Sequence, residues 1–188
     1  MRNVMRASDL TGLPVVSIAS GEDIAEVRDV VYDAERHALI GFTLNKRGML
    51  AGRLDGVLSA ASVAAIGADA VMVDRESALD GLDDSPDLLE RIEDAIPVIG
   101  NRVVSAEGNM LGEVVGVIVT TGSSAKAVGY EVDSADRSDS VFVPISEQMV
   151  LSGDNLLLPE RAAELIRNDL TGFGAAISAS DEMGGDQQ

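Results

Sequence analysis

The chain has 188 residues, of which 46% are hydrophobic and 24% charged, so it can bury a core and is not disordered throughout. Its 14 basic and 32 acidic residues give a formal net charge of −18, which disfavours direct binding to nucleic acid or to an anionic membrane surface. The lack of cysteine excludes disulfides and thiolate catalysis, and a single histidine excludes a multi-histidine metal cluster.

The first half of the chain is predicted to form short strands. Residues 21–31 place apolar side chains at helix-like spacing, whereas residues 39–44 alternate between two faces, with Ile40, Phe42 and Leu44 on the apolar one. A polar turn at 33–37 joins these segments. A strand at 53–58, a brief helical stretch at 60–65 and a final strand at 70–73 are expected to follow.

The same pattern returns later in the chain. Residues 108–118 match 21–31 at a shift of 108 − 21 = 87, and residues 128–132 match 40–44 at a shift of 88. In the second copy, Gly112 and Gly116 interrupt a β-branched run, which favours a strand over a helix. We therefore interpret both copies of the segment as strands in which a β-bulge produces the spacing of three, with Gly112 at the bulge at positive φ. Strands at 128–132, 140–144 and 156–158 and a helical stretch at 146–150 are expected to follow, with Glu131 on an outer face.

The region between the copies and the end of the chain are different in character. An apolar stripe within an acidic segment predicts a linker helix at 80–97, and a second helix is expected at 159–168. The small, polar segment 169–188 is predicted to be disordered. The predicted domains are therefore residues 8–79 and 98–168. No segment approaches the roughly 20 apolar residues of a membrane span, and the N-terminus lacks the apolar core of a signal peptide, so a cytoplasmic location is expected.

Both copies resemble the PRC-barrel family. The resemblance rests on Leu13-Pro14-Val15-Val16, Gly21, the strand from Ile24 to Asp33, Ile40-Gly41-Phe42 and Leu111-Gly112-Glu113-Val114. It departs at Ala25, where the family prefers glycine. The resemblance implies an all-β protein of two small antiparallel barrels with short helices and a helical linker. It also implies a binding or scaffolding module, because the family includes a barrel of the photosynthetic reaction centre, a ribosome maturation factor and archaeal cell-division proteins.

We expect a non-enzymatic adaptor or assembly module that binds one or more proteins, itself included in a possible homo-oligomer, and that holds no cofactor and no metal. The alternative is an accessory factor that binds a small molecule or an RNA-processing or ribosome-maturation complex. The candidate partner-contact loop consists of basic and large apolar residues that the second copy lacks: Lys46, Arg47, Met49, Leu50 and Arg53. The same basic side chains also suit a simpler role as local counterions on an acidic surface.

Three other patterns have a structural and a functional interpretation. His37 is expected in a solvated turn and not in a catalytic triad, because no nucleophile elbow accompanies it. Glu26 and Glu113 recur at matching positions, where the polar face of a repeated strand is the simpler explanation. The segment Asp80–Asp84 lacks the order of an EF-hand loop, and loose divalent binding is the most it suggests.

Overall fold

The structure, a computed structural model, describes residues 3–33, 36–47, 52–83, 98–123, 125–134, 139–146 and 148–184. The chain divides into two compact units, each interrupted in sequence. The N-terminal unit comprises Arg6–Ile96 and Thr120–Lys126, and the C-terminal unit comprises Met1–Met5, Pro97–Val119 and Ala127–Gln188. The predicted linker helix falls, from residue 84 on, outside the described residues.

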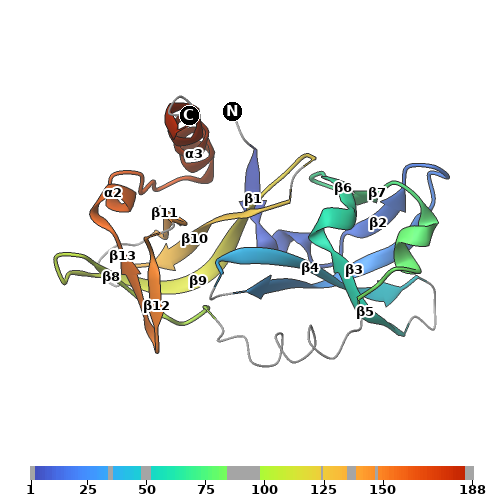
Figure 1. The fold of residues 1–188 in the computed structure, drawn as a ribbon, viewed down its shortest axis with the longest axis horizontal. Helices are drawn as coiled ribbons and strands as arrows, with labels where there is room; N and C mark the ends of the chain where they lie inside the picture. The colour runs from blue at the N-terminus through green and yellow to red at the C-terminus, as the bar shows by residue number, and fades with distance from the viewer. Residues whose placement is uncertain are drawn as a thin grey trace. The chain divides into compact units, whose positions relative to one another are not determined.

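The N-terminal unit is built on a six-stranded sheet with the order β5-β4-β3-β2-β7-β6 (Figure 1). Its strands are β2 (Pro14–Ser17), β3 (Asp23–Asp33), β4 (Ala38–Lys46), β5 (Arg53–Ser59), β6 (Val63–Ile66) and β7 (Val71–Val73). Three short 3-10 helices accompany them: η1 (Ala7–Leu10), η2 (Ala60–Ser62) and η3 (Glu76–Leu79). Phe42 and Leu44 are fully buried, as the alternation of this strand predicts, whereas Ile40, expected on the same face, is only partly buried.

The C-terminal unit is built on a sheet with the order β11-β10-β9-β8-β13-β12, to which β1 (Val4–Arg6) adds beside β9. Its strands are β8 (Arg102–Ser105), β9 (Met110–Thr120), β10 (Ala127–Asp133), β11 (Val141–Pro144), β12 (Val150–Ser152) and β13 (Asn155–Leu158). Two helices follow, α2 (Glu160–Ala163) and α3 (Leu170–Gly184). Val128, Tyr130 and Val132 of β10 are buried as expected, but so are Gly129 and Glu131 between them, so burial does not alternate along this strand.

The two sheets share their strand order and also their irregularities. The predicted β-bulges are present: the register skips Ile24 and Arg28 in β3, and Leu111 and Val115 in β9. Both pairs are separated by the shift of 87 seen in the sequence. A further skip occurs at Ile40 in β4 and at Val128 in β10, at the shift of 88. A bulge moves every side chain after it to the opposite face of the sheet. Three bulges at matching positions therefore give the two sheets the same pattern of side chains on each face.

Glycines hold corresponding positions where the backbones approach closely. A Cβ on Gly41 would lie 2.9 Å from the carbonyl carbon of Leu58, and one on Gly129 would lie 2.6 Å from the carbonyl oxygen of Val143. Gly112 is next to its bulge at φ +145, as predicted, and a Cβ there would lie 2.8 Å from the carbonyl carbon of Asp133. The first sheet has Ala25 at the corresponding position, buried and paired with Val15.

The prediction of two antiparallel barrels is wrong in two respects. Each sheet contains a parallel pair, β2 with β7 and β8 with β13, so the sheets are mixed. In the described part of the chain, no strand pairing joins the two ends of either sheet, so neither closes as a barrel. The physical reason is the path of the chain, which returns β7 and β13 to the inner strands β2 and β8 and leaves β6 and β12 at the edge.

The prediction that residues 169–188 are disordered is also wrong, because α3 occupies Leu170–Gly184. Asp169 caps the helix, since its Oδ1 accepts a hydrogen bond of 2.7 Å from the Gly172 amide. Phe173 and Ile177 are buried in a cluster with Ile118, Val128 and Phe142. This burial outweighs the cost of the helix glycines, about 1 kcal/mol each.

The position of Glu131 follows from the same helix. It was expected on an outer face, yet it is only 9% exposed. Glu131 is directly opposite Phe142 in the sheet and Phe142 lies beside Phe173, with ring centroids 6.0 Å apart, so α3 covers this face. The helix predicted at 159–168 is shorter than expected, since α2 ends at Ala163. Among the described residues, no helix has the length and apolarity needed to cross a membrane.

Candidate functional site

One basic residue of the predicted contact loop, Arg47, is already paired within its own sheet. Arg47 follows β4 and forms an ion pair with Asp23, and its Nη1 lies 3.6 Å from a carboxylate oxygen of Glu26. Both acidic residues belong to β3 of the same sheet. The charge of Arg47 is therefore balanced locally, which favours the counterion interpretation for this residue.

The other residues of the loop are only partly described. Lys46 ends β4, and its amide donates a hydrogen bond of 2.8 Å to the Gly52 carbonyl, which closes the loop at its base. Arg53 begins β5 opposite Asn45. Met49 and Leu50 lie outside the described residues, so their predicted contact with a partner stays a prediction.

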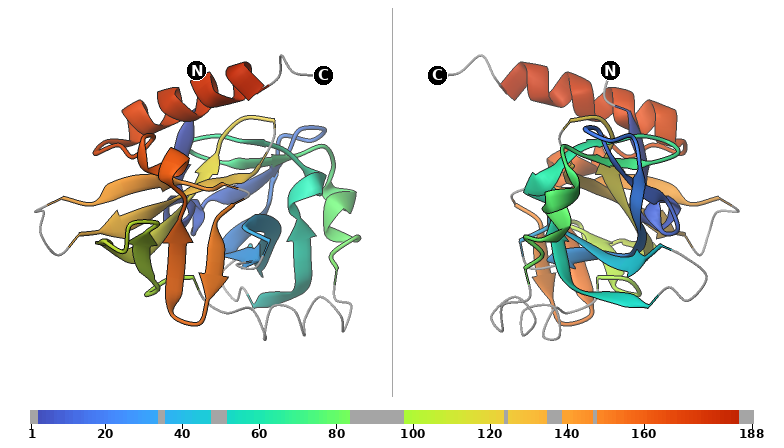
Figure 2. Two further views of the ribbon diagram at one scale, coloured as in Figure 1. Left: turned by 60° about the vertical axis from the view of Figure 1, so that its left-hand side comes forward. Right: turned by 90° about the vertical axis from the view of Figure 1, so that its right-hand side faces the viewer.

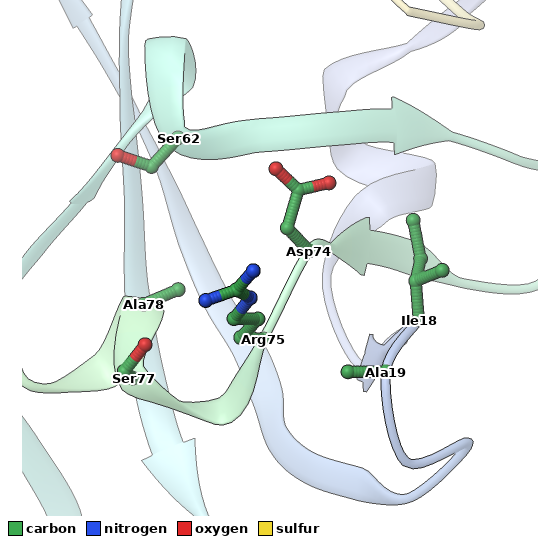
Figure 3. A pocket seen from close by; sticks show the side chains of 7 residues that line it. All are labelled: Ile18, Ala19, Ser62, Asp74, Arg75, Ser77 and Ala78. Atoms are coloured by element: carbon green, nitrogen blue, oxygen red, sulfur yellow. The ribbon is translucent and has the colours of Figure 1, made fainter.

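An open hollow of about 640 Å³ lies beside η3 in the N-terminal unit. Figure 3 shows Asp74 and Arg75 side by side within it, and its lining residues are Ile18, Ala19, Ser62, Asp74, Arg75, Ser77 and Ala78. Asp74 and Arg75 are exposed, so water reaches both charges. The volume is within the range of small-molecule sites, but the charged side chains that line the hollow are open to water, unlike the desolvated groups typical of a catalytic site.

The other sequence candidates are not brought together into one site. Glu26 faces Arg47, while Glu113 is opposite Arg102 in the second sheet. His37 has a left-handed conformation, φ 50, in the turn after β3. Over the described ranges, no group of three or more histidine, cysteine or acidic residues is arranged to hold a metal ion.

A feature that is not evident in the sequence lies on the C-terminal sheet. Val150 of β12 is opposite Leu157 of β13, Leu157 is opposite Val104 of β8, and Val104 is opposite Met110 of β9. Directly opposite residues project from the same face, so the four side chains form one line across four strands, here called the apolar row. Met110 is 54% exposed, Val150 51% and Leu157 43%, and Val104 is partly exposed.

The matching row of the N-terminal sheet has a different character. The corresponding register is Ala65, Met72, Val16 and Asp23. The first three are only partly exposed, and the row ends in Asp23, which is paired with Arg47. A single sequence cannot reveal this contrast, because the four residues of each row come from four separate segments and meet only through strand register.

The fold therefore defines a predominantly β protein built on two sheets of matching topology, one of which carries an exposed apolar row. Residues 2–79 match the family model of the PRC-barrel domain, which covers the first sheet and less than half of the chain. No curated protein matches the chain.

Proposed function

We propose that this chain is a non-enzymatic adaptor made of two PRC-barrel-like modules, which binds another protein through its second module. The match of residues 2–79 supports the first module. The shared strand order and the three matching bulges support the interpretation of residues 98–168 as a second copy.

The apolar row is the observation that carries this proposal. Isolated exposed apolar side chains are ordinary, whereas a contiguous apolar patch with a polar rim is typical of an interaction surface. Among the described residues, the second sheet presents such a row and the first does not, because the corresponding row of the first sheet ends in an ion pair. A duplicated module thus differs between its copies at the place where a partner would bind.

The hollow beside η3 favours one part of the alternative function, a small-molecule site. Its volume of about 640 Å³ is within the range of ligand pockets. The net charge of −18 argues against the RNA-linked part, because phosphates would be repelled. We place the adaptor function first because the hollow is open and lined by exposed charges.

Site-specific photo-crosslinking tests the adaptor function. A p-benzoylphenylalanine in place of Leu157 should crosslink, in the native cell, to one protein that mass spectrometry identifies reproducibly. The matched control is the same group at Met72, the corresponding position of the first sheet, which should give no such product. Equal crosslinking at both positions, or none at Leu157, would refute the proposal.

A further inference from the structure

Charged residues surround the apolar row, and acidic ones outnumber basic ones. On one side, the next cross-strand row contains Ser152, Asn155, Arg102 and Glu113, where the arginine is directly opposite Glu113. The turn between β8 and β9 adds Glu107, and the turn between β12 and β13 adds Asp154. Beyond β13, α2 begins with Glu160 and Arg161. Figure 2 (left) brings the orange β12–β13 hairpin toward the viewer. The row is thus an apolar strip whose surroundings carry four acidic and two basic side chains.

We infer that the apolar row docks a basic amphipathic segment of a partner protein. The apolar face of that segment packs on Val104, Met110, Val150 and Leu157, while its lysine or arginine side chains lie over Glu107, Glu113 and Asp154. This inference rests on the proposed adaptor function and specifies the chemistry of the partner. Opposite charges around an apolar centre steer association and reject acidic competitors.

The dimensions of the row fit a short helix. Adjacent strands are about 4.8 Å apart, so four strands span about 14 Å between the outer side chains. A helix rises about 1.5 Å per residue, so about ten residues cover that length. Apolar side chains at positions i, i+3 or i+4, and i+7 would meet the row on one helix face.

Charge argues against two other occupants. A second copy of the chain would bring two acidic borders together, each from a molecule of net charge −18. The segment 80–97 of the chain itself has apolar residues at helix spacing, but it contains seven acidic residues and one arginine. Neither complements the border of the row as a basic segment does.

Peptide titration tests the inference with the full chain. The probe is a labelled 14-residue peptide with leucine on one helix face and lysine elsewhere, measured by fluorescence anisotropy. Two controls are a peptide with glutamate in place of lysine, and a scrambled peptide of the same composition without an apolar face. We expect the amphipathic lysine peptide to bind most tightly and the glutamate peptide not to bind.

Variants of the row separate docking from general attraction to an acidic protein. Leu157→Gln with Val150→Thr should weaken the lysine peptide at least tenfold, while Met72→Gln in the first sheet should leave its affinity unchanged. Circular dichroism and thermal melting confirm that each variant is folded. Equal affinity for the native chain and the row variant, or equal binding of the scrambled peptide, would overturn the inference.

Two further results would assign the row to another occupant and also overturn the inference. A dimer in analytical ultracentrifugation that Leu157→Gln dissociates would identify a second copy. Peptide binding that occurs only after Leu88→Ser with Ile92→Ser would identify the segment 80–97. Specific crosslinking at position 157 to a partner without any basic amphipathic segment would reject the partner chemistry and leave the adaptor function standing.

Discussion

Substituting alanine for Gly112 tests the reason for the glycine at the bulge of β9. Its φ of +145 is strained for an alanine, and the new Cβ would lie 2.8 Å from the carbonyl carbon of Asp133, closer still to the oxygen. Backbone strain costs about 1–3 kcal/mol. Displacing the backbone of the neighbouring strand adds about 1–3 kcal/mol. We expect a total loss of about 2–6 kcal/mol in the free energy of unfolding of the C-terminal unit.

Urea denaturation measures this loss in one unit at a time. The chain has two tyrosines and no tryptophan, and Tyr130 is buried in the C-terminal unit. A Tyr32→Phe background therefore leaves Tyr130 as the reporter of that unit. With a denaturant slope of about 2 kcal/mol per molar urea, the midpoint should fall by about 1–3 M.

Two matched variants identify the cause of the loss. Gly108→Ala also places an alanine at positive φ, +86, but nothing lies within 4 Å of its new Cβ, so it should cost only about 1–2 kcal/mol. Ala25→Gly at the corresponding position of the first sheet should be destabilising, because it removes a buried methyl group. A Gly112→Ala midpoint equal to that of the parent, or equal to that of Gly108→Ala, would refute the close-approach argument.

The remaining predictions concern the helix, the ion pair and the corresponding glycine. Phe173→Ala should lower the free energy of unfolding of the C-terminal unit by about 3–5 kcal/mol and remove the hydrogen-exchange protection of α3. An unchanged exchange rate would contradict the role of Phe173 in holding α3 on the sheet. Arg47→Met should change the free energy of unfolding by no more than about 1 kcal/mol, since its pair with Asp23 is partly exposed, and thermal melting in low and high salt checks this. Gly41→Ala should destabilise the N-terminal unit by about 1–3 kcal/mol, because the new Cβ meets the Leu58 carbonyl. Urea denaturation measures this loss, and an unchanged midpoint would argue against that contact.

The spacing of apolar and β-branched residues predicted the strands and their β-bulges, because both depend on neighbours along the chain. The β-branched run of β9 and the alternation of Phe42 and Leu44 reflect a backbone that exposes its two faces in turn. The repeat shift of 87 predicted that a bulge in one copy has a counterpart in the other, and Ile24 and Leu111 confirm it. The pairing of Arg47 with Asp23, a residue 24 positions earlier, depends on strand register and not on neighbours along the chain, and the partner contact of the candidate loop stays a prediction.

The sequence by itself determined that this protein is β-rich and acidic and contains matching strand segments, because composition, spacing and repetition are properties of the chain alone. Only the tertiary structure decided that β7 and β13 return as parallel neighbours, that α3 forms over Glu131, and that four separate segments align the apolar row. The physical reason is the same in each case. A helix with glycines, a parallel pair or an exposed row depends on contacts between residues far apart in sequence, and their free energy enters only when the sheet has brought them together.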